Sequence, residues 1–237
     1  MVLELSVVIP AYNEARRLGP TLDRVAAYLG ERGIGHEIVV VDDGSTDATP
    51  EVVRSHPAPG LRLLVQEENR GKGAALRRGV AESRGARVLL SDADLSTPIE
   101  ELEVLERRLD GGATVAIGSR AMPDSDVRVH QPRHRELMGK TFNLIVRLLG
   151  VRGLRDTQCG FKLLEGDLAR RLFAELRTER YAYDVELVWL ARRHGHRVEE
   201  VGVTWVNSPD TRVHPLADSA AMLRDLVLMR WRHRRGR

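Results

Sequence analysis

Short apolar runs alternate with amphipathic segments through the first half of the chain. Runs of aliphatic and β-branched residues that end in polar or turn residues are typical of buried strands, and the segments between them carry apolar residues at helical spacing. The predicted strands are residues 5–9, 37–41, 61–66, 87–91 and 113–117. The predicted helices are residues 20–29, 47–55 and 73–83, with another beginning at residues 97–100. This alternation predicts an α/β protein whose mostly parallel, Rossmann-like sheet is flanked by helices.

The pattern changes after residue 118. Residues 122–135 are polar, contain two prolines and show no usable periodicity, which predicts a long functional loop. Further helices are predicted at residues 137–149, 167–176, 184–194 and 216–231, and one strand at residues 197–206. No internal repeat or low-complexity linker interrupts the chain, so we expect a single domain over residues 1–237.

The size and composition of the chain fit this architecture. Of its 237 residues 42% are hydrophobic and 30% are charged, which is enough for one large domain with a real core. Aromatic residues make up 4% of the chain, which disfavours binding of single-stranded nucleic acid, and we expect no nucleic-acid partner. The single cysteine, Cys159, excludes an intramolecular disulfide and is typical of a reducing compartment.

No segment is suited to crossing a membrane. The longest apolar stretch, residues 142–151, contains Arg147 and is shorter than the ~18 residues that a span needs. The chain enters its first predicted strand directly after Glu4, without the basic leader of a secretory signal. We therefore expect a cytoplasmic protein, with any membrane contact peripheral on the cytoplasmic face.

Two carboxylates follow the strand predicted at residues 87–91. Asp92 and Asp94 are separated by Ala93, and residues i and i+2 of an extended chain point to the same side. Both acids then face one place at the carboxyl edge of the sheet, where α/β proteins bind ligands. Paired carboxylate oxygens suit Mg²⁺ or Mn²⁺, ions that usually also hold a phosphate. The alternative is a solvated turn before a helix, in which Asp is also common.

Two other predicted strands end in polar residues. Pro10 cannot continue a central ladder, so we expect the chain to turn there and to present residues 12–14 (Tyr-Asn-Glu), unless this is an ordinary strand-to-helix turn. Asp42 and Asp43 end the second strand, and one of these carboxylates can accept hydrogen bonds from a nucleobase N–H or from ribose hydroxyls. Residues 45–47 (Ser-Thr-Asp) compete as helix caps, so at least one of them is expected to be structural.

Glycines and a basic residue precede the third predicted helix. In residues 69–73 (Asn-Arg-Gly-Lys-Gly), Lys72 can hold a phosphate at the helix N-terminus, or the segment can serve loop geometry alone. The spacing is not that of a P-loop, and no Gly-x-Gly-x-x-Gly follows the first strand, which disfavours a Rossmann dehydrogenase. Among 37 basic side chains only Lys72, Lys140 and Lys162 are lysine, which weakly favours a need for a compact charge at these positions.

The order of these motifs resembles family 2 glycosyltransferases of the GT-A fold. Residues 155–162 (Arg-Asp-Thr-Gln-Cys-Gly-Phe-Lys) look like the signature of dolichyl-phosphate β-glucosyltransferases and their bacterial polyprenyl-phosphate relatives. Residues 179–186 match another of their segments, with Tyr where Trp and Phe are expected. The resemblance extends over residues 5–230.

The resemblance implies a nucleotide-sugar-binding half (residues 1–118), an acceptor half (residues 119–212) and a C-terminal amphipathic helix with a basic tail (residues 213–237). It implies transfer of a hexose, with glucose from UDP-glucose as the best choice, to a polyprenyl or dolichyl phosphate with inversion at the anomeric carbon. Asp94 and Asp92 would hold Mg²⁺ or Mn²⁺ against the donor diphosphate. The donor-binding residues would be Pro10, Tyr12, Asn13, Glu14, Asp42, Asp43, Lys72, Asp92, Ala93 and Arg212.

A phosphate acceptor requires positive charge more than it requires a base. A phosphomonoester is largely anionic at neutral pH, because its second pKa lies near ~6. The candidate cations are Arg120, Arg135, Lys162 and Arg212. The resemblance assigns Arg120 to the leaving diphosphate or the acceptor phosphate and Arg135 to the acceptor, although each cation can also be a solvated surface side chain. Asp156 would orient the acceptor or act as a base, unless it is a buried structural carboxylate paired with Arg155 or Lys162.

Departures from the family leave other functions open. Ser96 stands where the mannosyl-phosphate branch often has Gln, which weakens a mannosyl assignment, and the N-terminal membrane helix of the eukaryotic enzymes does not precede residue 5. The alternatives are GDP-mannose as donor, a soluble small molecule or saccharide as acceptor, and a non-catalytic nucleotide-sugar-binding protein. The sequence leaves the oligomeric state open, a homo-oligomer included.

The last predicted helix has two interpretations. Leu216, Ala220, Leu223 and Val227 lie on one stripe, followed by Trp231 and an arginine cluster. An amphipathic helix that ends in basic residues and an interfacial Trp suits an anionic membrane surface. The alternative is a helix packed on the core, with a frayed and solvated tail.

Overall fold

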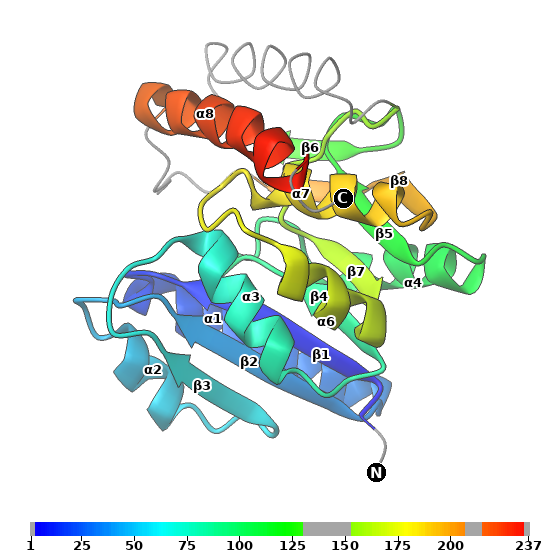
Figure 1. Ribbon diagram of the computed structural model, residues 1–237. Coiled ribbons are helices and arrows are strands. Elements are labelled where there is room, and N and C mark those ends of the chain that lie inside the picture. Colours follow the sequence, from blue (N-terminus) through cyan, green and yellow to red (C-terminus); the bar gives the residue numbers. More distant parts are fainter. Residues whose placement is uncertain (1–2, 130–152, 207–214, 235–237) are drawn as a thin grey trace.

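Strands and helices alternate along the chain (Figure 1). The computed structural model describes residues 3–129, 153–206 and 215–234. The strands are β1 (Leu5–Ala11), β2 (His36–Asp42), β3 (Leu61–Val65), β4 (Arg87–Leu90), β5 (Val115–Ser119), β6 (Asp126–Val129), β7 (Lys162–Glu165), β8 (Val198–Gly202) and β9 (Thr204–Val206). The helices are α1 (Ala15–Arg32), α2 (Thr49–Ser55), α3 (Lys72–Glu82), the short 3₁₀ helix η1 (Ile99–Glu101), α4 (Leu102–Asp110), α6 (Gly166–Glu175), α7 (Tyr183–Arg193) and α8 (Pro215–Arg234).

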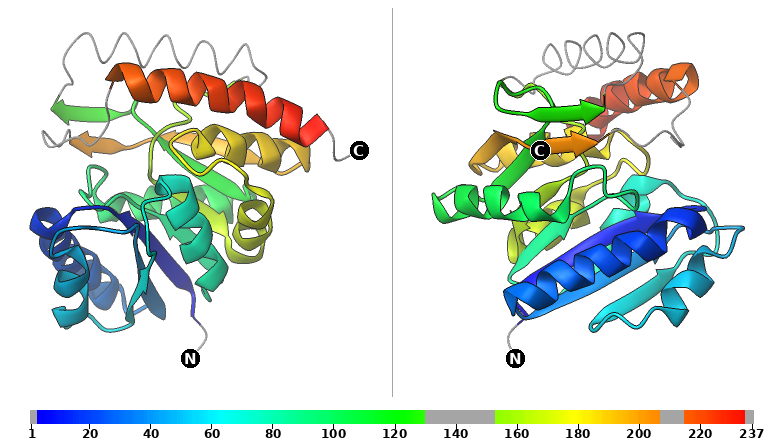
Figure 2. Two further views of the ribbon diagram at one scale, coloured as in Figure 1. Left: turned by 60° about the vertical axis from the view of Figure 1, so that its left-hand side comes forward. Right: turned by 180° about the vertical axis from the view of Figure 1, so that it is seen from behind.

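A seven-stranded sheet in the order β3-β2-β1-β4-β7-β5-β8 is covered by helices on both faces (Figure 2). Helices α3, α6 and α7 lie on one face, and α1, α2 and α4 on the other. Alternate residues of β1 supply both cores, because Val8 packs on the α3 side whereas Val7 and Ile9 pack on the α1 side. Strands buried on both faces form continuous apolar runs, which is why β1 to β5 were predictable.

The sheet is parallel except for β7. Strands β1 to β4 pair in parallel, as do β5 and β8, whereas β7 lies antiparallel between β4 and β5. This strand was not predicted, because it is short and begins with Lys162. Its direction matters for the site, since it brings Lys162 and the residues before it to the carboxyl ends of β4 and β5.

Two predicted boundaries were wrong. β1 does not turn at Pro10 but continues to Ala11 in register with β2. The strand tolerates Pro10 because its missing N–H faces the β4 side, where pairing has already ended at Val8. Helix α1 begins at Ala15 rather than at residue 20, so Pro20 lies inside it.

A second, two-stranded sheet pairs β6 with β9 in parallel. β6 lies within the segment predicted as a loop, and the single strand predicted at residues 197–206 is divided into β8 and β9. The division falls at Val203, whose N–H donates to the carbonyl of Ser119 (3.2 Å) as the chain leaves the large sheet. Residues 130–135 of the predicted loop and the helix predicted at residues 137–149 lie outside the described residues.

The predicted C-terminal helix is confirmed as α8, which packs on α7 (Figure 1). Met222 and Leu226 are buried in the core on the α7 side. The ring of His233 bonds to the buried carboxylate of Glu186 (2.6 Å), so the end of α8 is docked rather than frayed. The side chains of the predicted stripe, Leu216, Ala220, Leu223 and Val227, lie outside those that the structure describes.

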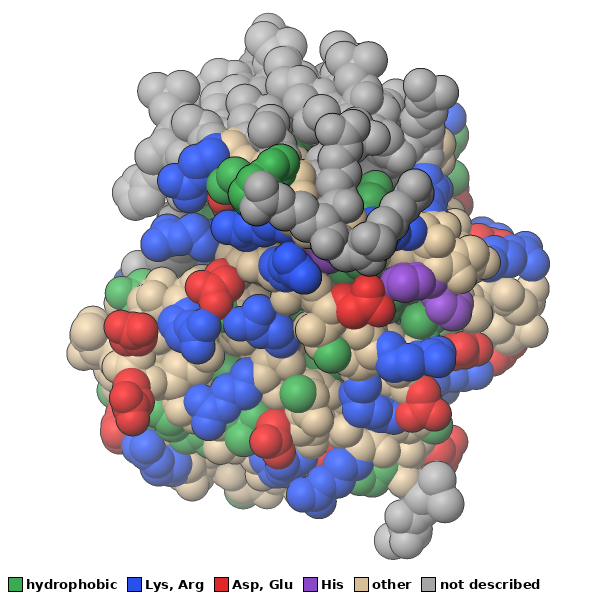
Figure 3. Space-filling model, viewed as in Figure 1, with side chains coloured by type: hydrophobic (Ala, Val, Ile, Leu, Met, Phe, Trp, Pro, Cys, Tyr) green, Lys and Arg blue, Asp and Glu red, His purple; other side chains and the backbone are tan. Residues whose placement is uncertain are grey.

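The surface of the described residues is mixed in charge. Lys and Arg side chains are interspersed with Asp and Glu over the face that α3 and α6 cover (Figure 3). None of the helices within the described ranges combines the length and the apolar character that crossing a bilayer requires.

A buried carboxylate ties several segments together at the amino-terminal edge of the sheet. Glu37 accepts hydrogen bonds from Ser6 Oγ (2.7 Å), from the backbone N–H of Arg84 (2.6 Å) and from Arg62 (2.8 Å). Burial alone would raise the pKa of Glu37, but these donors hold it below its usual value. The stability that Glu37 contributes is therefore present above its unfolded-state pKa and is lost as the pH falls through its folded-state pKa.

We expect Glu37→Gln to lower the free energy of unfolding by about 1–3 kcal/mol at pH 7. The difference from the wild type should shrink as the pH falls below the ordinary glutamate pKa of 4.5, and urea denaturation at neutral and acidic pH measures both effects. Glu82→Gln is the matched control, because Glu82 pairs with the same Arg62 at 3.6 Å but is 55% exposed. It should cost less than about 0.5 kcal/mol, and equal losses for the two variants would contradict this account.

Candidate active site

The predicted site residues gather where four strands end. β1, β2, β4 and β5 run in the same direction, so their carboxyl ends share one edge of the sheet. Asp42 ends β2, Asp94 follows β4, and Arg120 directly follows β5. Among the described residues, the two non-glycine residues with positive φ, Asn13 (54°) and Leu95 (48°), also lie in these loops. Backbone strain of this kind is concentrated at functional sites.

Lys72 neutralises Asp92 at this edge. Its Nζ lies 2.5 Å from Oδ1 of Asp92. Burial alone would raise the pKa of the Asp92 carboxyl, but the nearby cations, Lys72 foremost, together outweigh it and hold that pKa below its usual value. Burial would likewise lower the pKa of Lys72, yet Asp92 and Asp184 raise it. Both partners are therefore charged at neutral pH. The other oxygen of Asp92 lies beside Gly160, where an added Cβ would collide with it.

Asp94 lies in a tight turn beside this pair. Its Oδ1 accepts the N–H of Ser96 (3.1 Å), and its Oδ2 lies 3.7 Å from Nη1 of Arg17. Arg17 also pairs with Glu14 at 2.6 Å. Glu14, which was predicted to bind the nucleotide sugar, is therefore linked to Asp94 by the guanidinium that both carboxylates share. The side chain of Asp94 is 23% exposed, which leaves it accessible to a ligand.

The two carboxylates fit a divalent cation that is held mainly by its substrate. Within the described ranges, no three or more His, Cys, Asp or Glu side chains are arranged to hold an ion by themselves. Mg²⁺ commonly keeps several waters and binds through one or two carboxylates plus substrate phosphates. Since Lys72 already takes one oxygen of Asp92, Asp94 is the stronger ligand candidate. The remaining ligands would come from a diphosphate and water.

Asp42 and Asp43 differ in what they can offer. Both oxygens of Asp43 are used within the protein, where they accept the backbone N–H groups of Arg70 (2.9 Å) and Gly71 (2.8 Å) and a side-chain amide. Burial outweighs these bonds and raises the pKa of Asp43. Asp42 accepts the N–H of Ser45 (3.3 Å) on one oxygen, but its buried Oδ1 has no hydrogen-bond partner among the described residues. Because a buried unpaired oxygen is costly, Asp42 is the better candidate for contact with a ligand.

The other predicted donor residues lie in the same loops. The side-chain oxygen of Asn13 accepts the N–H of Thr46 (2.8 Å), and the backbone N–H of Asn13 donates to Ser45 Oγ (2.8 Å). Asn13 thus joins the loops that follow β1 and β2. Tyr12 is 37% exposed. Ala93 is buried, and its carbonyl accepts a hydrogen bond from the hydroxyl of Thr21 in α1 (2.8 Å).

Lys162 lies fully buried beneath this edge. Its ammonium bonds to the carboxylate of Asp184 and to a backbone carbonyl. The Nζ atoms of Lys162 and Lys72 lie 5.8 and 5.9 Å from the ring centroid of Tyr183. Two of the three lysines in the chain thus form one layer with Tyr183 and Asp184 below the carboxylates, and the charge of Lys162 is neutralised inside the protein.

Asp156 is paired with Arg120 rather than with Arg155 or Lys162. Nε and Nη2 of Arg120 lie 2.6 and 2.9 Å from its two oxygens, and the backbone N–H groups of Arg120 and Gln158 donate to the same carboxylate. Burial alone would raise the pKa of Asp156, but Arg120 outweighs it and holds that pKa below its usual value. Asp156 is 2% exposed. A buried, ionised carboxylate with both oxygens engaged favours a structural role over that of a base.

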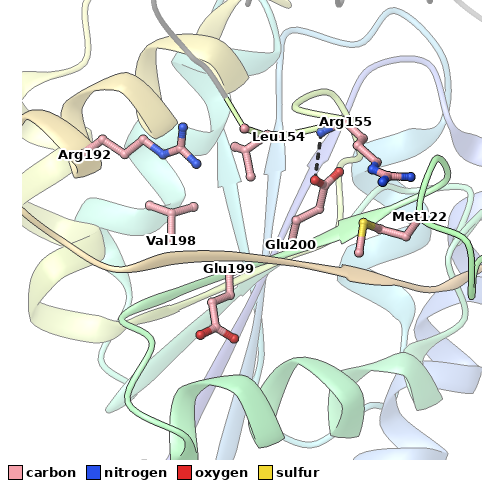
Figure 4. Close-up of a pocket in the computed structure, with 8 residues that line it drawn as sticks. Met122, Leu154, Arg155, Arg192, Val198, Glu199 and Glu200 are labelled. Carbon is pink, nitrogen blue, oxygen red and sulfur yellow. Dashed lines mark hydrogen bonds between the residues drawn. The ribbon is translucent and has the colours of Figure 1, made fainter.

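A pocket of 370 Å³ lies next to the loop of Asp156 (Figure 4). Arg155, Arg192, Glu199 and Glu200 are among its lining residues. Glu200 points toward Arg155, whose backbone N–H it accepts (2.8 Å), and it also accepts the N–H of Asp156 (2.7 Å). Asp92 and Asp94 do not line this pocket. The pocket is connected to the candidate site only through Glu200, which accepts the backbone N–H of Asp156.

Several residues of this arrangement were not predicted. Arg17 beside Asp94, Glu200 behind Asp156 and Trp205 against Arg120 lie in segments whose pattern indicated only a helix or a strand. Asp184 could have been found, since it lies in the segment at residues 179–186 that resembles the family. Arg135 and Arg212 lie outside the described residues.

The chain is similar in sequence to a known protein family. Residues 6–173 match the family described as glycosyl transferase family 2. The chain belongs to this family. Membership confirms the resemblance drawn from the motifs.

Two curated relatives of this family 2 glycosyltransferase carry the same activity name. This chain is 36% identical over 246 residues to the dolichyl-phosphate beta-glucosyltransferase of Dictyostelium discoideum, a match that covers 98% of this chain and 75% of that protein. It is 40% identical over 244 residues to the protein of the same name from Drosophila melanogaster, covering 96% of this chain and 74% of that one.

A solved structure shows the same fold. Glucosyl-3-phosphoglycerate synthase from Mycobacterium tuberculosis, crystallised with Mn²⁺, UDP and glucosyl-3-phosphoglycerate, superposes with a TM-score of 0.70. The identity is 24%, and the match covers 96% of this chain and 78% of that chain. The predicted fold, a GT-A domain with a mostly parallel sheet flanked by helices, is thereby confirmed.

Proposed function

We propose that this glycosyltransferase moves glucose from UDP-glucose to a dolichyl or polyprenyl phosphate, with inversion at the anomeric carbon and with Mg²⁺ or Mn²⁺ as cofactor. The names of its curated relatives support both the sugar and the acceptor. The observation that carries the proposal is the set of charges at the carboxyl edge. Lys72 and Arg120 lower the pKa of Asp92, while the carboxylate of Asp94 stays accessible. The presence of these charged groups argues against a non-catalytic binding protein.

We assign binding of the donor to the loops that follow β1, β2 and β4 and to the start of α3. We propose that the unpaired Oδ1 of Asp42 accepts a hydrogen bond from the uracil N–H or from a ribose hydroxyl. Lys72 and Asp92 would meet the diphosphate, with Pro10, Tyr12, Asn13, Glu14, Asp43 and Ala93 shaping the loops around it. A divalent cation at Asp94 would neutralise the charge that develops on the departing diphosphate.

The acceptor phosphate supplies its own nucleophile. It is largely ionised at neutral pH, because its second pKa lies near ~6. One of its oxygens forms a bond to the anomeric carbon while the bond from that carbon to UDP breaks on the opposite face, which gives inversion. No proton has to be removed, in agreement with the engaged oxygens of Asp156.

The charge of the acceptor has to be balanced by cations. In the proposal Arg120 meets a phosphate directly, and Asp156 acts by orienting Arg120. Arg135 and Arg212, outside the described residues, are the further candidates. Lys162 acts through the buried layer below Asp92, whose pKa it helps to lower.

A transfer assay tests the proposal. With UDP-[¹⁴C]glucose, dolichyl phosphate and Mn²⁺, we expect label in the organic phase, and none when a chelator is present. Transfer from GDP-mannose should be at least about tenfold slower, since a site that hydrogen-bonds one substrate discriminates strongly against another. Equal transfer from GDP-mannose, or preferential transfer to soluble 3-phosphoglycerate, would contradict the proposal in favour of one of the alternatives.

A peripheral contact with an anionic membrane surface is part of the proposal, since the acceptor is a lipid. Trp231 near the end of α8 is 52% exposed, and basic residues surround it in the sequence. Each basic residue near such a surface contributes about 1 kcal/mol. We expect Trp231→Ser to reduce flotation with phosphatidylserine vesicles, and unchanged flotation would contradict this contact.

A further inference from the structure

Trp205 lies against the guanidinium of Arg120. The guanidinium carbon is 5.4 Å from the centre of the indole ring, within the range of a cation–π contact. Trp205 is 9% exposed and belongs to β9, a strand outside the large sheet. The pattern of residues in this segment indicated no chemistry for it.

Asp156 and Trp205 together fix the orientation of Arg120. The carboxylate takes Nε and Nη2, and the indole covers one face of the guanidinium. Nη1 forms no hydrogen bond to any other residue in the described ranges, and the Arg120 side chain is 30% exposed. Because a guanidinium is planar and its donors are fixed relative to one another, holding two of its nitrogens also aims the third.

β9 is also bonded to the turn that presents Asp94. The N–H of Val206 donates to the carbonyl of Ser96 (2.8 Å), and the N–H of Ser96 donates to Asp94 (3.1 Å). β9 pairs with β6 as well, so Trp205 is carried by a strand with partners on two sides. This strand therefore connects the turn of Asp94 with the residue that supports Arg120.

We propose that Trp205 is a positioning residue for phosphate recognition: it holds Arg120 so that Nη1 faces the phosphate of the acceptor, at a distance from Asp94 that β9 fixes. The inference rests on the proposed function. Trp205 itself touches no reacting atom. Without it, Arg120 keeps its charge and its bond to Asp156 but loses the surface against which it is held. Donor binding through Asp42 and Lys72 should remain intact.

Substitutions at Trp205 test this inference. We expect Trp205→Leu to lower kcat/KM for dolichyl phosphate at least about tenfold, since misplacement of a binding group costs up to about 100-fold. Trp205→Phe keeps an aromatic face and should recover most of the activity. Trp189→Leu is the matched control, because Trp189 on α7 makes the same kind of contact with Arg193 (4.9 Å) away from the site, and its activity should be unchanged.

Two further measurements separate positioning from a structural role. The Kd for UDP-glucose with Mn²⁺ should be the same in Trp205→Leu as in the wild type when it is measured well below the melting temperature of the variant, which falls because a buried indole is lost. Parallel losses of donor binding and turnover would overturn the inference, and so would an unchanged kcat/KM. If the wild-type chain transfers no glucose, the proposed function fails by itself. Titration with inorganic phosphate then decides the inference, which requires weaker binding by Trp205→Leu than by the wild type.

The bond from Val206 to Ser96 can be tested separately. Val206→Pro removes the N–H that reaches Ser96, whereas Val206→Thr keeps it and serves as control. We expect the proline variant to bind Mn²⁺ in the presence of UDP several-fold more weakly, measured by the electron paramagnetic resonance signal of free Mn²⁺. Equal affinities for the two variants would show that β9 does not hold the Asp94 turn.

Discussion

Asp94→Asn is expected to reduce turnover by about 10³-fold while leaving the fold intact. Asparagine keeps the shape of the side chain and an oxygen that can accept the N–H of Ser96 (3.1 Å). It removes the charge that would hold a divalent cation against the donor diphosphate. Because the side chain is 23% exposed, the exchange opens no cavity in the core. The rate is measured with UDP-glucose and dolichyl phosphate over a titration of Mn²⁺, together with the melting temperature.

Asp126→Asn is the matched control for this variant. Asp126 lies in β6 and is 55% exposed, and it pairs with Arg128 (2.8 Å) on the surface, so its neutralisation should leave the rate unchanged. If Asp94→Asn retained a near-normal rate, and if that rate survived a chelator, the assignment of Asp94 to the metal would be wrong.

Gly160→Ala should cause the second large loss of activity, at a residue whose side chain takes no part in the chemistry. A Cβ at this position would collide with the Asp92 carboxylate. Asp92 would have to move, and its 2.5 Å pair with Lys72 would be disturbed. We expect kcat to fall by about 100-fold, the usual cost of misplacing a site group by about 1 Å. The measurements are kcat and the melting temperature.

Gly30→Ala is the control for the added methyl group. A Cβ at Gly30, in α1, would meet no atom within 4 Å. That variant should be fully active and about 0.5–1 kcal/mol more stable, because alanine is the better helix former. Full activity of Gly160→Ala would show that the position of Asp92 beside Lys72 does not matter for catalysis.

The parallel part of the fold follows from local patterns. Each of the strands β1 to β5 is an apolar run that both faces of the sheet bury, and such runs are recognisable in the sequence. β7 could not be predicted in this way, because its stability comes from partners far away in the chain. Leu163 pairs with Leu89 on one side and with Ala116 on the other. The division of β8 from β9 likewise depends on a change of partner.

The carboxylates of the site were predictable for a related reason, since each follows a strand end that lies at one edge of the sheet. Their partners were not. Lys72 and Asp92 are 20 residues apart, and Arg120 and Asp156 are 36 residues apart. All four residues were candidates in the sequence. Asp156 was predicted to orient the acceptor or to act as a base, with a structural pairing to Arg155 or Lys162 as the alternative, and its pairing with Arg120 was not predicted. Nothing in the sequence pattern indicated that Trp205 contacts Arg120, because a tryptophan in a predicted strand is most often part of a hydrophobic core.

The central claim is that Asp94 and its neighbours bind a nucleotide sugar through a divalent cation. The most direct measurement is the melting temperature of the wild-type chain with UDP-glucose, with Mn²⁺ and with both, since ligands that bind the native state raise it. We predict a clear increase with both ligands together, a much smaller one with either alone, and loss of the combined increase in Asp94→Asn. An equal increase from UDP-glucose in the presence of a chelator, or in Asp94→Asn, would contradict the claim.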